Sequence, residues 1–231
     1  IVGVYPGNPT RGLPLVRGVL LALRSDNGDI ILEAPAEEAT GWRTAGASAL
    51  ALELMGYDGG GVLGVIGSGV QARYHLRVLA GLYDLDGVIV YSRNRSRAER
   101  LASQYGGVYR PLDYLLSEST VIVAATNSVE PVVKGSLVRP GSFIVSVGAP
   151  RPVRELDDTV LERAGCILVD SPIAREESDD AQAPCTVTLR EALQGASVEY
   201  GDLRVYKSVG TPLLDLAAVV AILGSLGYRI H

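Results

Sequence analysis

Two glycines at the end of an apolar run have the spacing that is typical of turns that bind the pyrophosphate of a dinucleotide. The stretch "GVIGSGVQA" places Gly67 and Gly69 between a strand-like run and a helical pattern, with Ala72 as the third small residue. The first glycine allows a tight turn, the second admits the pyrophosphate to the backbone, and helix N–H groups bind its charge. We therefore predict a dinucleotide site formed by Gly67, Ser68, Gly69, Val70 and Gln71. A glycine-rich turn that binds no nucleotide is the alternative.

The end of the next strand-like run indicates which dinucleotide binds. An acidic residue about 20 positions after the glycines would bind the ribose diol of NAD, but this chain has "YSRNRSR" there. Arginine forks hydrogen bonds onto phosphate, and no carboxylate is present to repel a 2'-phosphate. We expect NADP(H) as the preferred cofactor, NAD(H) as the second choice, and Ser92, Arg93, Asn94 and Arg97 as binding residues. The alternative is a solvated basic helix start.

The composition restricts the partners and the location. The 231 residues carry a net charge of -5, which gives no reason to expect a nucleic-acid partner. The longest apolar run is shorter than the roughly 20 residues of a membrane helix, and no targeting segment is visible. Cys166 and Cys185 predict no disulfide framework or zinc site, and they are interpreted as core residues in a reducing compartment. We expect a cytoplasmic protein without a metal.

The pattern of elements changes near residue 62. Before it, apolar runs at 1–5, 16–22 and 30–33 predict antiparallel strands, with a tight turn at Asn27-Gly28, and residues 37–55 have helical spacing. After it, strand-like and helical stretches alternate, which predicts a parallel sheet. The expected strands are 62–66, 88–91, 120–125, 143–147 and 167–170, and the expected helices are 70–82, 96–105 and 157–164. The acidic stretch "SPIAREESDDAQAP" is interpreted as an exposed helix or loop with a solvated charged face.

Several separate motifs resemble one family. At "GWRTAGASALA", "GVIGSGVQARYHL", "VGAPRPVREL" and "YKSVGTPLLDLAA" the chain resembles the ornithine cyclodeaminase and mu-crystallin family, whose members use a nicotinamide cofactor. The resemblance implies an α/β fold with a Rossmann-type doubly wound parallel sheet and a discontinuous α+β substrate-binding and dimerisation domain. We place the Rossmann domain at 56–199 and the second domain at 1–55 and 200–231. Residues 1–33 and 203–226 are expected to form one antiparallel layer that pairs two copies as a homodimer.

The resemblance also implies site residues. Arg43 in "WRTAG" matches the arginine that binds the substrate carboxylate, although an internal ion pair is the structural alternative. Further cofactor residues follow the ends of predicted strands, where open α/β sheets bind ligands. They are Thr126, Asn127, Val147 and Gly148. The resemblance also places "KSVG" beside the nicotinamide, with Ser208 and Val209 as the matching positions. His75 is interpreted as a packing or surface residue.

Two departures from the family pattern bear on the reaction. Pro150 stands where cyclodeaminases have an aspartate that transfers protons, and proline has no proton to give. The family's substrate lysine would immediately precede Ile1, so we expect an N-terminal segment to precede this chain, and no catalytic residue is assigned. The function expected is NAD(P)H-dependent oxidation or reduction of a small amino or imino acid. The alternatives are an ornithine cyclodeaminase and a non-catalytic, NADP-dependent ligand-binding protein.

Overall fold

The computed structural model describes residues 1–5, 7–14 and 16–228, and the chain divides into two compact units. The smaller unit comprises Ile1–Arg43 and Pro212–His231, and the larger unit comprises Thr44–Thr211. One division falls inside helix α1 (Ala36–Leu54), and the sequence-based boundaries after residue 55 and before residue 200 differ from both divisions. In the part of the chain that the structure describes, no helix combines the length and apolarity needed to cross a membrane.

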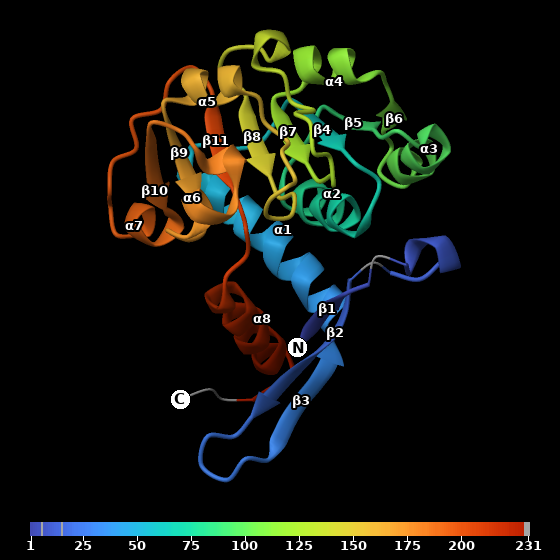
Figure 1. Ribbon diagram of the computed structural model, residues 1–231, viewed down its shortest axis with the longest axis vertical. Coiled ribbons are helices and arrows are strands. Elements are labelled where there is room, and N and C mark those ends of the chain that lie inside the picture. The colour runs from blue at the N-terminus through green and yellow to red at the C-terminus, as the bar shows by residue number, and fades with distance from the viewer. Residues whose placement is uncertain (6, 15, 229–231) are drawn as a thin grey trace. The chain divides into compact units, whose positions relative to one another are not determined.

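The larger unit is built on an eight-stranded parallel sheet with the order β10-β9-β11-β8-β7-β4-β5-β6 (Figure 1). The chain reverses its direction of travel across the sheet between β4 and β7, as in a doubly wound fold. The strands are β4 (Val62–Ile66), β5 (Gly87–Tyr91), β6 (Val108–Tyr109), β7 (Val121–Ala124), β8 (Phe143–Ser146), β9 (Cys166–Val169), β10 (Cys185–Thr188) and β11 (Arg204–Lys207). The helices of this unit, besides most of α1, are α2 (Val70–Leu82), α3 (Arg95–Ser103), α4 (Leu112–Glu118), α5 (Asp158–Ala164), α6 (Ala174–Glu177) and α7 (Leu189–Leu193).

The carboxyl ends of the central strands lie in one row. Paired neighbours along this row are Tyr91, Ile66, Ala124, Ser146 and Lys207, each the last residue of its strand. The loops that follow these strands therefore emerge side by side at one edge of the sheet. In open α/β sheets this edge, next to the reversal of strand order, is where ligands bind.

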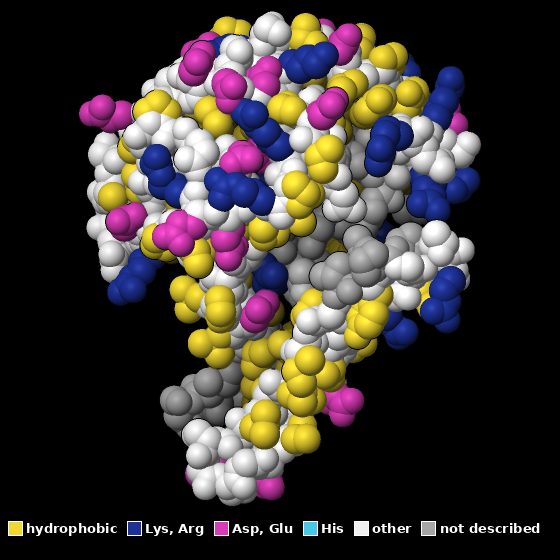
Figure 2. Space-filling model, in the orientation of Figure 1, with side chains coloured by type: hydrophobic (Ala, Val, Ile, Leu, Met, Phe, Trp, Pro, Cys, Tyr) yellow, Lys and Arg dark blue, Asp and Glu magenta, His cyan; other side chains and the backbone are white. Residues whose placement is uncertain are grey.

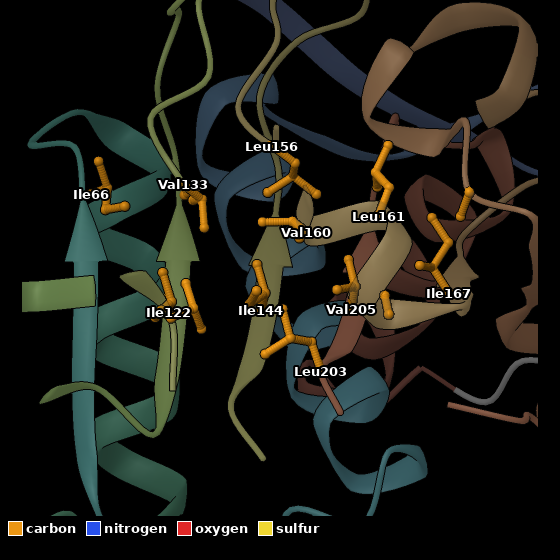
Figure 3. Close-up of a cluster of buried hydrophobic side chains, with 14 of the residues drawn as sticks. Ile66, Ile122, Val133, Ile144, Leu156, Val160, Leu161, Ile167, Leu203 and Val205 are labelled. Atoms are coloured by element: carbon orange, nitrogen blue, oxygen red, sulfur yellow. The ribbon is translucent and has the colours of Figure 1, made fainter. Parts of the chain in front are cut away.

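A continuous hydrophobic core covers one face of this sheet (Figure 3). Ile122 and Ile144 of the central strands pack with Val160 and Leu161 of α5, and all four side chains are less than 5% exposed. On α2, the predicted packing residue His75 is fully buried and contacts Ser48 of α1. The core thus fixes the strands whose ends carry the candidate site.

The smaller unit contains a three-stranded antiparallel sheet and helix α8 (Pro212–Ser225). Its strands are β1 (Val2–Val4), β2 (Val16–Leu23) and β3 (Ile30–Pro35). The predicted turn between β2 and β3 is present, with Gly28 at a φ of 79°. The sheet does not contain residues 203–207, contrary to prediction, because Arg204–Lys207 pair in parallel between β8 and β9 of the larger unit.

Two further expectations are wrong. Cys166 and Cys185 form a disulfide, because parallel pairing of β9 with β10 places them opposite each other, with their Cα atoms 4.4 Å apart. The acidic stretch is not a uniformly solvated face, because Asp180 is fully buried within it. Neither the disulfide nor the burial of Asp180 has a local signal in the sequence. Both depend on segments that meet only in the folded protein.

Candidate functional site

The glycine turn joins β4 to α2 at the reversal of strand order. Gly67 is buried, has a φ of 128°, and a Cβ there would lie 2.4 Å from the carbonyl oxygen of Ala125. Gly69 is exposed, and nothing lies within 4 Å of the position that its Cβ would take. The first glycine is therefore required by the fold, whereas the second leaves an open surface over the backbone.

The start of α2 has the features of an anion site. Its first turn contains no acidic residue, and no side chain caps it. Gln71 in that turn has a buried Oε1 without a hydrogen-bond partner among the described residues. Since backbone N–H groups at a helix start attract negative charge, these residues fit the pyrophosphate and an adjoining donor group of a dinucleotide.

Among the residues after β5, two make local hydrogen bonds that hold the start of α3, and two are exposed arginines. The Ser92 hydroxyl donates to the carbonyl oxygen of Asn94, and Asn94 Oδ1 accepts from the N–H of Arg97 as the N-cap of α3. Arg93 and Arg97 are exposed. The predicted basic start of α3 is thus held in a defined conformation beside the glycine turn.

A pocket of about 350 Å³ connects the glycine turn to α3. Ser68, Gly69 and Val70 line one side and Arg97 the other, so the structure brings these predicted residues together. The remaining lining residues, which sequence reasoning did not select, are Arg73, Arg100, Leu101 and Gln104. The helical spacing of positions 97, 100, 101 and 104 would have placed them on one face of α3. Three arginines around a pocket beside a glycine turn suit a ligand with more than one phosphate group.

A buried carboxylate holds the loops after β7 and β8. Glu155 accepts hydrogen bonds from the N–H and hydroxyl of Thr126, and from the N–H of Gly148. The N–H of Val147 donates to the carbonyl oxygen of Ala124, which continues the pairing of β8 with β7. Asn127 is exposed. The structure thus gathers these predicted residues at the carboxyl edge, on a support that the sequence analysis missed.

The loop after β11 is held by Asp170, which follows β9. The carboxylate of Asp170 accepts from the hydroxyl of Ser208, at 2.7 Å, and from the N–H groups of Val209 and Gly210. Val209 also packs against the hydrophobic core. Both side chains predicted to contact the cofactor therefore have structural partners of their own.

Three fully buried charged side chains lie behind this edge, and the sequence analysis selected none of them as a site residue. Lys207 Nζ lies 3.4 Å from Asp180 Oδ2 and donates to Ser146 Oγ, which in turn donates to Glu155 Oε2 at 2.8 Å. Buried charges are expensive unless paired and hydrogen-bonded, and these are.

The other predicted residues make none of the hydrogen bonds described for this network. Arg43 belongs to the smaller unit, where its Nε lies 2.7 Å from Asp215 Oδ1 of α8. Pro150 is exposed in the segment after β8. In the described part of the chain, no group of three or more His, Cys, Asp or Glu side chains is arranged for a metal ion.

Comparison with known proteins agrees with this geometry. The chain is 30% identical to ketimine reductase mu-crystallin of Rattus norvegicus over 97% of this chain and 74% of that protein. It superposes on Thermococcus litoralis Delta(1)-pyrroline-2-carboxylate reductase, in complex with NADH and L-proline, with a TM-score of 0.85 and 26% identity, covering 100% and 79% of the two chains. An archaeal alanine dehydrogenase dimer with bound NAD gives a TM-score of 0.80 at 25% identity, covering 99% and 78%. The model of the ornithine cyclodeaminase/mu-crystallin family matches residues 1–226, and the chain belongs to that family.

Proposed function

We propose that this protein is an NADP(H)-dependent oxidoreductase. Its substrate is a small α-imino acid, either cyclic or open-chain, which it reduces to the corresponding amino acid. The observation that carries the proposal is the open glycine turn continuous with a pocket containing three arginines. When bound, the dinucleotide supplies the hydride to the substrate's α-carbon. The chain supplies binding and orientation for that transfer, as family membership leads us to expect.

The preference for NADP(H) rests on charge. Arg73, Arg97 and Arg100 line the pocket, and its lining includes no acidic side chain among the residues that the structure describes. An arginine can bind a 2'-phosphate with two hydrogen bonds, and an acidic residue that would repel the phosphate is missing after β5. The structural relatives with bound NADH or NAD keep NAD(H) as the competing choice.

The direction toward imine reduction rests on Pro150. Cyclodeamination needs a group that moves protons as the amine leaves, and a proline ring has none to give. Reduction of a protonated imine needs no such group at this position. Arg43 would bind the substrate carboxylate through its guanidinium, which has several N–H donors besides the one nearest Asp215.

Substrate assays test this reaction. The full-length protein should oxidise NADPH in the presence of pyrroline-2-carboxylate, or of pyruvate with ammonia, followed by NADPH absorbance. It should form little or no proline from ornithine. Rapid proline formation would instead establish a cyclodeaminase, and binding of NADPH without turnover of any of these substrates would establish a ligand-binding protein.

A homodimer formed through the smaller unit is part of the proposal. Figure 2 shows hydrophobic side chains gathered on α8 and on the β2-β3 hairpin. Leu216 and Val220 on α8 and Leu23 and Ile30 on the hairpin are 43–60% exposed. Exposed apolar side chains gathered in this way are typical of an interface, and the alanine dehydrogenase relative is a dimer. A stable monomer in light scattering at micromolar concentration would contradict this assembly.

We also propose that the enzyme works in the cytoplasm. The Cys166–Cys185 disulfide counts against this location, because disulfides are rare in that compartment. Mass spectrometry of alkylated protein taken directly from cells would show whether the pair is oxidised there.

A further inference from the structure

Glu155 binds four donors that come from three positions at the carboxyl edge of the sheet. Its Oε1 accepts from the Thr126 N–H at 2.6 Å and from the Thr126 hydroxyl at 2.8 Å. Its Oε2 accepts from the Ser146 hydroxyl and from the Gly148 N–H, both at 2.8 Å. The side chain is fully buried, so one carboxylate connects the loop after β7 to the end of β8 and the loop that follows it.

The loop after β8 is shaped to admit this carboxylate. A Cβ at Gly148 would lie 2.7 Å from Glu155 Cδ and 2.8 Å from Oε2, which is closer than real Cβ atoms come. Only a glycine therefore lets the carboxylate approach the loop backbone closely enough to accept its N–H. The contact requires both the glycine at position 148 and the carboxylate of Glu155, so packing alone does not account for it.

Two further buried charges hold Glu155 in turn. Asp180 accepts from the backbone N–H groups of Glu155 and Leu156, at 2.9 to 3.0 Å. Lys207, the last residue of β11, donates to the Gly148 carbonyl oxygen and to Ser146 Oγ, and pairs with Asp180. The network therefore fixes the position of the carboxylate as well as its partners.

We propose that Glu155 is a positioning residue for hydride transfer, acting through Thr126 and Gly148 to set the relative placement of the two loops that flank the bound nicotinamide. The role rests on the proposed function, because it assumes that the dinucleotide extends from the glycine turn along the carboxyl edge. That edge, beside the reversal between β4 and β7, is where open α/β sheets bind ligands. Glu155 itself contacts loop atoms and no reacting atom.

Glu155→Gln tests the proposal with little change in volume. Glutamine offers one acceptor oxygen and one amide nitrogen, so one pair of donors would face an N–H₂ group and move away. At saturating NADPH and imino acid, and well below the melting temperature, kcat should fall about 100-fold, the effect of a misplacement of about 1 Å. The substrate KM should change by less than about threefold, because the groups that bind its carboxylate are untouched.

Asp157→Asn is the matched control. Asp157 is two residues further along, and its Oδ1 accepts from the N–H groups of Gly135 and Val160 at the start of α5. This variant also replaces a carboxylate by an amide, but its Oδ1 can still accept both N–H groups, so the melting temperature should change little and kcat should stay within about twofold of wild type. Equal losses of kcat in both variants, or an unchanged kcat in Glu155→Gln, would overturn the proposal.

Two further measurements keep the outcome decisive. If Glu155→Gln does not fold, Gly148→Ala keeps the carboxylate but displaces it, and an unchanged kcat in that variant would overturn the proposal. If the wild-type protein binds NADPH but reduces no substrate, the proposed function fails and affinity decides the positioning role. NADPH binding about tenfold weaker in Glu155→Gln than in Asp157→Asn would then support it, since 1.4 kcal/mol is tenfold in affinity, and equal affinities would overturn it.

Discussion

The guanidinium of Arg43 on α1 lies 2.7 Å from the carboxylate of Asp215 on α8, within the smaller unit. Its Nε is buried but makes no hydrogen bond among the described residues, so the two groups pair by proximity without an aligned N–H. Asp215 is half exposed, with 50% of its side-chain surface accessible. Because an ion pair with one exposed partner contributes at most about 1 kcal/mol, Arg43 is not committed to the fold by this contact.

Arg43→Ala should therefore weaken substrate binding more than it weakens the protein. Loss of a charged hydrogen-bond partner costs about 2 kcal/mol, which corresponds to a rise in substrate KM of about 30-fold. The melting temperature should fall by less than about 4 °C, and NADPH affinity should not change. Asp215→Asn frees the guanidinium and should lower KM. A collapse of the melting temperature at unchanged KM would instead assign Arg43 to a structural ion pair.

The second prediction concerns cofactor choice. Fluorescence titration of the wild-type protein should show NADPH binding at least as tightly as NADH, and an order-of-magnitude preference for NADH would contradict it. Ser92→Asp should reverse the preference, because a carboxylate after β5 repels the 2'-phosphate.

Variants of the pocket arginines refine that test. Arg73→Gln and Arg97→Gln should each weaken NADPH binding about tenfold and leave NADH binding nearly unchanged, because each removes a charged partner of the extra phosphate. Arg110→Gln is the control, because Arg110 is exposed and stacks over the Tyr114 ring outside the pocket. Equal losses for both cofactors would place the arginines on the pyrophosphate.

The central elements could be predicted because their patterns are local. The strand Val62–Ile66 and the helix Val70–Leu82 match their sequence-based bounds, since an apolar run, a glycine turn and a helical period follow one another there. The candidate site residues that lie within such motifs were selected in the same way. The remaining site residues are defined by contacts across the fold, and these have no local period.

Asp180 and Lys207 illustrate that limit. Asp180 lies in a run of acidic residues, and nothing in such a run indicates which member is buried. Its partner Lys207 is 27 residues away, on a strand assigned from the sequence to the other unit. Arg73 was not selected because its place in the pocket depends on residues of both α2 and α3. The sequence pattern of one helix does not show which residues of another helix lie beside it.

The third prediction concerns the Cys166–Cys185 disulfide, which joins β9 to the edge strand β10. Closing a loop with a sequence separation of 19 residues contributes about 3 kcal/mol, mainly by restricting the unfolded chain. Reduction with a phosphine should therefore lower the melting temperature by about 10 °C. A Cys166→Ala, Cys185→Ser double variant should melt near the reduced protein and should not respond to the reductant. Identical melting of the oxidised and reduced wild type would contradict the stabilising role.

The last prediction concerns the pH dependence of stability, and it rests on His75. Burial lowers the pKa of His75 to about 4 from its ordinary value of 6.5, and the hydrogen bond to the Gln71 carbonyl only partly opposes this shift. That carbonyl is an acceptor, so the neutral ring carries its proton on Nδ1 and presents Nε2 to the Ser48 hydroxyl at 2.9 Å. Protonating Nε2 would put an unpaired charge between α1 and α2.

The sign follows from proton uptake. Between about pH 6.5 and pH 4 the unfolded chain binds a proton at His75 that the folded protein does not, so the free energy of unfolding falls as the pH falls. The contribution is complete above pH 6.5 and decreases by about 1.4 kcal/mol per pH unit within the window, to a total of about 3 kcal/mol.

Urea unfolding at pH 7, 6, 5 and 4.5 measures this loss, and His75→Gln is the control because its amide can still meet Ser48 but does not titrate. The variant should be less stable at pH 7 and should lose less stability on acidification. The curves of the two proteins should therefore converge toward pH 4. The carboxylates that also titrate, such as Asp202, whose pKa is lowered by Arg163, cancel in the difference between the two proteins. Parallel curves would show that His75 takes up a proton in the folded state as easily as in the unfolded chain, and that its burial does not control the acid stability of this fold.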